Sequence, residues 1–210
     1  MPEVIKLFRG PTAVREQIKK HLVATVPGYI QMLRDHYGLS IDELPDIGRY
    51  DAYEPLTLDH GSPPIIGINV PRTNTFTMTD LDPNAGEEYR PTYYVNIFLW
   101  LYSPLDPETE RPIQPEYDQT IRTRDDLSAA IRAALLHDLS FGNEDLIQHD
   151  SNRMEEIYTD TVPVKGNRWT TGTQWTIELR VDEGIYRESV GEVEVFDPNV
   201  AYHDGEEEFI

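Results

Sequence analysis

Cysteine does not occur among the 210 residues. Its absence excludes a disulfide framework, a thiolate metal site and a thiol nucleophile. No stretch approaches the ~20 consecutive apolar residues of a membrane-spanning helix. The opening residues Met1-Pro2-Glu3 do not begin a signal peptide pattern. We therefore expect a protein that folds in the cytoplasm and has no membrane partner.

Basic residues are scarce, with 18 Lys and Arg against 38 Asp and Glu and a net charge of −20. Such a chain repels nucleic acid phosphates on average, so specific DNA binding is not expected. The charge is uneven: residues 1–38 carry +3, whereas residues 182–210 carry −9. Opposite signs at the two ends could steer contact between copies of the chain.

Catalytic and cofactor motifs are also missing. The sequence contains no GxSxG elbow, no phosphate-binding loop and no dinucleotide fingerprint. The segment 80–88 resembles a calcium loop only superficially, since the glycine is one place late and Pro91 occupies the position of the final Glu. We expect no catalytic residue, no cofactor and no metal. None of the histidines has zinc-ligand spacing, and His21 and His137 are expected at solvent edges: His21, His36, His60, His137, His149 and His203.

What the sequence does contain is a clear order of elements, beginning with an amphipathic helix. Thr12 is a candidate N-cap, and Gly38 is a candidate C-terminal stop. Pro27-Gly28 should kink or split the helix. The apolar residues recur every three or four positions and predict one buried stripe: Val14, Ile18, Leu22, Val26, Ile30, Leu33 and Tyr37.

Two apolar strands are expected next, at Ile65–Val70 and Tyr93–Tyr102. The second has apolar side chains on both faces: Val95, Ile97, Leu99 and Leu101 on one, and Tyr94, Phe98, Trp100 and Tyr102 on the other. A strand of this kind must be covered on both faces. Helices can cover one, and the other needs a loop or a neighbouring subunit.

A second helix and two further strands complete the pattern. Thr123 is the expected cap of the helix, and Phe141-Gly142-Asn143 should end it. Its predicted buried stripe is Leu127, Ile131, Ala134, Leu135 and Leu139. Arg153–Val164 is predicted to be a strand with an edge at Pro163, and Lys165-Gly166-Asn167 is a turn signal. The segment 166–173 is predicted to be a hairpin loop, and Thr173–Val181 an alternating strand.

These elements predict an α+β fold with a mainly antiparallel sheet, flanked by a long N-terminal helix and a shorter second helix. We expect one domain over residues 1–181, with long irregular insertions at 39–64, 71–92 and 103–122. Residues 182–210 form an acidic C-terminal extension, in which Gly191–Phe196 could be a short edge strand. Aromatic rings and Arg commonly anchor protein interfaces. The candidate interface residues are Tyr93, Trp100, Tyr102, Trp169, Arg15, Lys19 and Lys20.

The order of elements resembles that of tail terminator, or tail-completion, proteins of long-tailed bacteriophages. The likeness rests on the first helix, the strand Tyr94-Val95-Asn96-Ile97-Phe98-Leu99, the helix Asp126-Leu127-Ser128-Ala129-Ala130-Ile131 and the strand Gln174-Trp175-Thr176-Ile177-Glu178-Leu179. It covers about two thirds of the chain. The resemblance implies a homohexameric ring in the virion neck that caps the tail tube, stops its polymerisation and docks the head connector. It also implies that DNA passes through the ring and that there are no catalytic residues.

Three alternatives stay open at this point. The chain could be another neck protein, such as a head–tail adaptor or stopper, or another tail-associated subunit. It could be a small hydrolase that uses a carboxylate pair or bound calcium. It could also be a binding module that works as a monomer.

Overall fold

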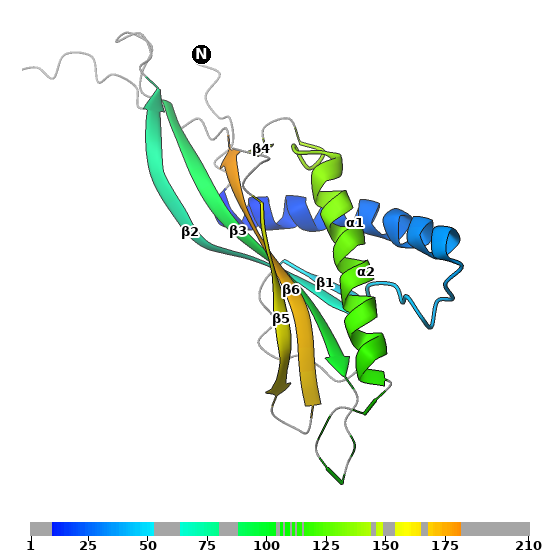
Figure 1. Ribbon diagram of the computed structural model, residues 1–210. Helices are drawn as coiled ribbons and strands as arrows, with labels where there is room; N and C mark the ends of the chain where they lie inside the picture. Colours follow the sequence, from blue (N-terminus) through cyan, green and yellow to red (C-terminus); the bar gives the residue numbers. More distant parts are fainter. Residues whose placement is uncertain are drawn as a thin grey trace, which may run out of the picture.

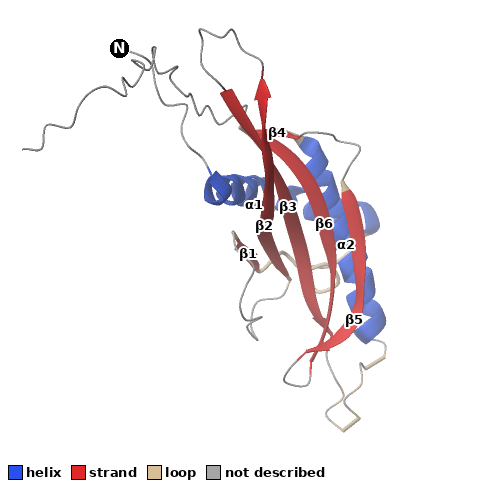
Figure 2. Ribbon diagram, turned by 90° about the vertical axis from the view of Figure 1, so that its left-hand side faces the viewer, coloured by secondary structure: helices blue, strands red, loops and turns tan. Residues whose placement is uncertain are grey.

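The protein is a two-layer structure in which both helices cover the same face of one sheet (Figures 1 and 2). The computed structural model describes residues 10–52, 64–79, 88–103, 106, 108–109, 111, 113–114, 116–143, 146–148, 154–164 and 168–181. In chain order the elements are α1 (Gly10–Tyr37), β1 (Arg49–Asp51), β2 (Ile65–Thr79), β3 (Glu88–Ser103), α2 (Glu116–His137), β4 (Leu146–Gln148), β5 (Glu155–Val164) and β6 (Arg168–Val181).

The six strands follow the order β1-β2-β3-β6-β4, and β5 also pairs with β6. Among the strands that the structure describes, β1 and β2 pair in parallel, and the other four pairs are antiparallel. β4 and β5 lie one after the other along the same edge of β6, β4 beside its C-terminal end. The predicted α+β class with a mainly antiparallel sheet is therefore confirmed.

The core lies between the sheet and the two helices. Alternate residues of β3 and β6 point into it, and all are 5% exposed or less: Val95, Ile97, Leu99, Leu101, Trp175, Ile177, Leu179 and Val181. These are the inward faces that the alternating pattern predicts. The predicted strand faces of β3 and β6 are thus correct.

Helix α1 buries its predicted stripe from Val14 to Ile30. Pro27 does not split it, and the helix continues for ten residues to Tyr37. Tyr37 is 63% exposed, so its expected burial is wrong: it is the last helical residue and extends beyond the core. Gly38 has a φ of 68°, and Leu39 N–H donates to the Arg34 carbonyl at 3.0 Å. This pair of features is the Schellman helix end that a glycine stop predicts.

Helix α2 begins at Glu116, seven residues before the expected cap at Thr123. The Thr123 hydroxyl instead donates to the backbone carbonyl of Glu43 at 3.1 Å, which joins α2 to the segment after α1. Leu139 lies beyond the helix end and is 37% exposed, so its expected place in the stripe is also wrong.

The two helices are locked together near the end of α2. His21, expected at a solvent edge, is 7% exposed, and its Nε2 donates to the Ala134 carbonyl at 2.9 Å. Phe141 packs edge-on against the His21 ring at a centroid distance of 5.2 Å. Gln17 donates to the Phe141 carbonyl at 2.6 Å. Since His21 contacts both the end of α2 and the residues that follow it, this histidine belongs to the helix interface.

Most of the expected loop 71–92 is strand. β2 and β3 continue past the rest of the sheet as a two-stranded arm, bent by register shifts at Asn69/Arg72 and Asn74/Thr77 (Figure 1). These bulges explain why the polar segment shows no simple alternation. The threonines at 73, 75, 77 and 79 are the β-branched signal that the sequence did offer.

The remaining strand predictions have mixed outcomes. β5 is an edge strand containing Pro163, as expected. Residues 168–173, expected in a hairpin loop, belong to β6 and pair with both β3 and β5. The short strands β1 and β4 were not expected. The turn at 165–167, the segment 80–87 and residues 182–210 lie outside the described residues.

Gly172 is expected to be indispensable, because an added Cβ would collide with the backbone carbonyl of Leu99 on β3. Replacing Gly172 with Ala should lower the free energy of unfolding by about 1–3 kcal/mol, the usual cost of overpacking. Gly28→Ala is the matched control, since Gly28 is helical with open space around it. That change should raise the same free energy by roughly 0.5–1 kcal/mol. Urea unfolding measures both, and equal stability of the two variants would contradict the close approach of β3 and β6.

Candidate functional site

The sheet face opposite the helices carries a row of aromatic side chains from β3. Paired residues in adjacent strands share a face, so Tyr94, Phe98, Trp100 and Tyr102 all lie on the side away from the core. Each is half-buried. Ile157 of β5 joins them, because it lies beside Gln174, which pairs with Phe98, and it is 47% exposed. We call these five residues the aromatic face. No described helix covers it (Figure 2).

Two of the rings form a rigid stack in the middle of this face. Phe98 and Trp100 are parallel, with ring centroids 5.0 Å apart and an angle of 7° between their planes. Gly67 pairs with Phe98 on one side, and Gly172 pairs with Trp100 on the other. The other cross-strand partners carry side chains on the same face: Ile65 of β2 pairs with Trp100, and Gln174 of β6 pairs with Phe98. Each ring therefore has a glycine on one side and a side chain on the other, and Ile65 beside Trp100 is fully buried.

The arm-side end of the same face is charged. Arg72 lies over the Tyr94 ring at 3.9 Å, and Asn74 donates to the Tyr94 hydroxyl at 2.8 Å. Glu178 pairs with Tyr94 in the register, and Arg180 follows two residues later on the same side. The Arg180 Nε atom is buried and has no hydrogen-bond partner among the described residues. Towards the arm the face therefore carries charges of both signs, Arg72 and Arg180 together with Glu178.

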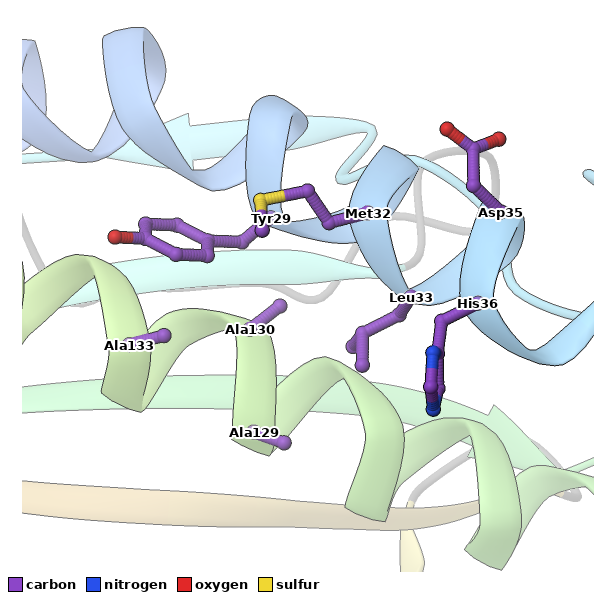
Figure 3. Close-up of a pocket in the computed structure, with 8 residues that line it drawn as sticks. All are labelled: Tyr29, Met32, Leu33, Asp35, His36, Ala129, Ala130 and Ala133. Atoms are coloured by element: carbon purple, nitrogen blue, oxygen red, sulfur yellow. The ribbon is translucent and has the colours of Figure 1, made fainter.

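A groove between α1 and α2 opens on the helix side of the molecule (Figure 3). Its volume is about 560 Å³. Tyr29, Met32, Leu33 and His36 come from α1, and the floor on α2 consists of small side chains, Ala129, Ala130 and Ala133. Met32 is 63% exposed. The hydrogen bond between the Tyr29 hydroxyl and His137 Nδ1, 2.9 Å long, joins the two helices at one end. We call this feature the interhelical groove.

Acidic groups border the interhelical groove. Asp35, on α1, accepts a hydrogen bond from Gln31 at 2.7 Å and points away from α2 (Figure 3). Asp126 lies one turn before Ala129 and Ala130 on the same side of α2. It makes no hydrogen bond or ion pair with the described residues. Burial, with a smaller contribution from the neighbouring Asp125, raises the pKa of Asp126.

A polar clamp fastens β5 to α2. Arg132 donates from Nε and Nη2 to the two carboxylate oxygens of Glu156 at 2.5 and 2.8 Å, and from Nη2 to the Tyr158 hydroxyl at 2.9 Å. The Tyr158 hydroxyl donates to Glu156 at 2.7 Å. Burial alone would raise the pKa of Glu156, but the hydrogen bonds from Arg132 and Tyr158 outweigh it and lower this pKa. The clamp holds the strand that carries Ile157.

A scan against protein-family models and a search of curated proteins found no match for this chain. The part of the chain that the structure describes contains no group of three His, Asp or Glu side chains placed to hold a metal ion. Among the same residues, no helix is long and apolar enough to cross a membrane. The candidate calcium loop at 80–88 lies almost wholly outside the described residues.

The structure places the aromatic candidates for the interface in different parts of the fold. Trp100 and Tyr102 lie on the aromatic face. Tyr93 is 4% exposed and belongs to the core, and its neighbour Tyr94 takes the outer position. Tyr93 lies two residues before Val95, so the alternation of β3 places both side chains on the core face. Trp169 is in β6, paired with Ser103, rather than in a turn.

The basic candidates Arg15, Lys19 and Lys20 all lie on α1, in the helix layer, and so are not brought together with the aromatic face. Arg15 donates to the Thr12 hydroxyl at 3.2 Å, and Lys20 is exposed. Sequence reasoning missed the interhelical groove altogether. Two features of the sequence could have indicated the groove: Met32, which lies off the apolar stripe of α1, and the alanines at 129, 130 and 133 of α2.

Glu156→Gln is expected to lower the free energy of unfolding at pH 7 by about 1–2 kcal/mol, because Arg132 loses a charged partner. The pKa of Glu156 is lowered in the folded state, so its contribution is fully present above the unfolded value of about 4.3. That contribution is lost as the pH falls through the folded pKa, and the wild-type advantage should vanish there.

Urea unfolding at pH 7 and at steps below pH 5 measures this effect. Glu155→Gln is the matched control. Glu155 is exposed, and because it directly precedes Glu156 on β5, its side chain lies on the sheet face away from α2. The free energy of unfolding of the Glu155→Gln protein at pH 7 should equal that of the wild type. A Glu156→Gln protein that keeps a constant deficit down to pH 2 would contradict the role of the ionised carboxylate.

Proposed function

We propose that the protein is a structural subunit of a phage neck, which assembles with copies of itself into a ring that ends the tail tube and joins it to the head connector. The observation that carries this proposal is the aromatic face. A row of half-buried aromatic side chains that no described helix covers is typical of a surface that packs against another protein.

The order of elements supports the same function. The long first helix, the doubly apolar strand β3, the Ala-containing α2 and the alternating strand β6 are the elements on which the resemblance to tail terminators rests, and all four are present. Both helices lie on one side of the sheet. A subunit of this shape has two different broad faces, which a ring built by rotation requires.

The charge suits passage of DNA through such a ring. With a net charge of −20 per subunit, an assembly of several copies repels phosphates on average. An acidic lumen would let DNA traverse without specific binding. Lys and Arg side chains lining the channel would contradict this part of the proposal.

The purified protein should run as an oligomer of defined mass in size-exclusion chromatography with light scattering. Negative-stain images should show a ring, sixfold if the resemblance holds, and addition of tail tubes should place it at one end only. A monomer at every concentration tested would contradict the ring. Binding along the whole tube would instead indicate another tail-associated subunit, and binding to connectors alone would indicate a head–tail adaptor.

A further inference from the structure

The interhelical groove is an apolar surface that the described residues leave open. Met32 on the α1 side is 63% exposed. Leu136 of α2 is 45% exposed and continues the line of Ala129 and Ala133, since helical residues three and four positions apart share one side. Exposed large apolar side chains beside an apolar hollow mark a surface that another segment covers. The small alanine side chains leave room there for large side chains of a partner (Figure 3).

One charge beside the groove has no partner. Asp126 lies one turn before the alanines on α2, is half-buried, and makes no side-chain hydrogen bond or ion pair with the described residues. Its exposed neighbour Asp125 is paired with Arg124 at 2.7 Å. The basic side chain Arg122 comes a further turn towards the start of α2, beyond the residues that line the groove. The unpaired charge next to the alanines is therefore negative, and a basic partner suits it.

One segment outside the described residues has the composition that suits this groove. Residues 4–9 have the sequence Val-Ile-Lys-Leu-Phe-Arg, which combines four apolar side chains with two basic ones. We call them the basic segment. The other segments of eight residues or more outside the described part are acidic: 53–63, 80–87 and 182–210. Since Asp126 would repel an acidic segment, the basic segment is the better occupant.

The basic segment is too short to reach the groove of its own copy. Gly10 begins α1, and Tyr29 is the first residue along that helix to line the groove. At 1.5 Å per residue, these two positions are about 28 Å apart along the helix. Val4 precedes Gly10 by six residues, and six extended residues span only about 20–22 Å. If the basic segment fills a groove, that groove belongs to another copy.

We propose that the basic segment of one copy binds in the interhelical groove of a neighbouring copy, an inference that rests on the ring proposed above. Its apolar side chains cover the alanines and Met32, whose flexible thioether adapts to a partner. Lys6 and Arg9 are the cations that can meet Asp126. Because each copy both gives a segment and receives one, the contact repeats from copy to copy and closes in a ring.

The absence of cysteine allows a direct test by cross-linking. A disulfide forms only where two Cα atoms come within about 7 Å. The double variant with Leu7→Cys and Met32→Cys should give a ladder of covalently joined copies after oxidation, seen on a non-reducing gel. Leu7→Cys with Ile41→Cys is the matched control, since Ile41 is 59% exposed and does not line the groove. The control should cross-link at least about tenfold less.

Two single substitutions test the same contact without a cross-link. Phe8→Asp places an acid in the basic segment, and Met32→Asp places one in the groove, at a side chain that is exposed. Each should raise the protein concentration needed for assembly roughly tenfold, while Ile41→Asp should leave it unchanged. Light scattering over a dilution series measures that concentration, and far-UV circular dichroism confirms the fold of each variant.

Other outcomes separate the two proposals. If the wild type forms rings and Met32→Cys cross-links to Leu7→Cys no better than Ile41→Cys does, the groove contact is overturned while the ring stands. A disulfide that closes within one copy overturns the exchange between copies. Stronger cross-linking of Leu7→Cys to Ile157→Cys would instead put the basic segment on the aromatic face. If the wild type is a monomer throughout, the ring itself fails and takes the groove contact with it.

Discussion

The packing of the inner half of β3 against the two helices is the contact on which the rest of the structure depends. β3 is flanked by β2 and β6, so it cannot turn away from either neighbour. Once Val95, Ile97 and Leu99 are buried, the intervening side chains must point to the other face. The aromatic face is therefore the reverse of the core, produced by the same strand. A slip of one residue would exchange the two, and the close approach at Gly172 resists that slip.

The sequence predicts well those features that depend on local period. The stripe of α1, the inward residues of β6 and the glycine stop at Gly38 all follow from spacings of a few residues. Features set by distant partners were missed. Thr123 has the chemistry of a helix cap, but its hydroxyl bonds the Glu43 carbonyl from within α2. The arm at 71–92 was missed because two bulges break its alternation, and β1 exists only because β2 offers an edge.

The same distinction between local spacing and distant partners applies to the candidate surfaces. Trp100 and Tyr102 could be assigned to the outer face because alternation along one strand decides the matter. The interhelical groove needs two helices that are separated by 78 residues in the chain, and their crossing is fixed by contacts such as that of His21 with Ala134. No spacing in the sequence reveals that Met32 and Ala133 line one space. The Arg132–Glu156 clamp, which joins α2 to β5, is likewise invisible until the fold is known.

The proposed assembly must reconcile self-association with a net charge of −20 on every copy. Long-range repulsion between copies is screened within about 8–10 Å at physiological salt, so it opposes encounter more than contact. Apolar burial is short-ranged and does not depend on the Debye length, and the exposed part of the aromatic face, such as Ile157, offers apolar surface for it. Arg72 and Arg180 share that face with Glu155 and Glu178, so a partner would meet charges of both signs there.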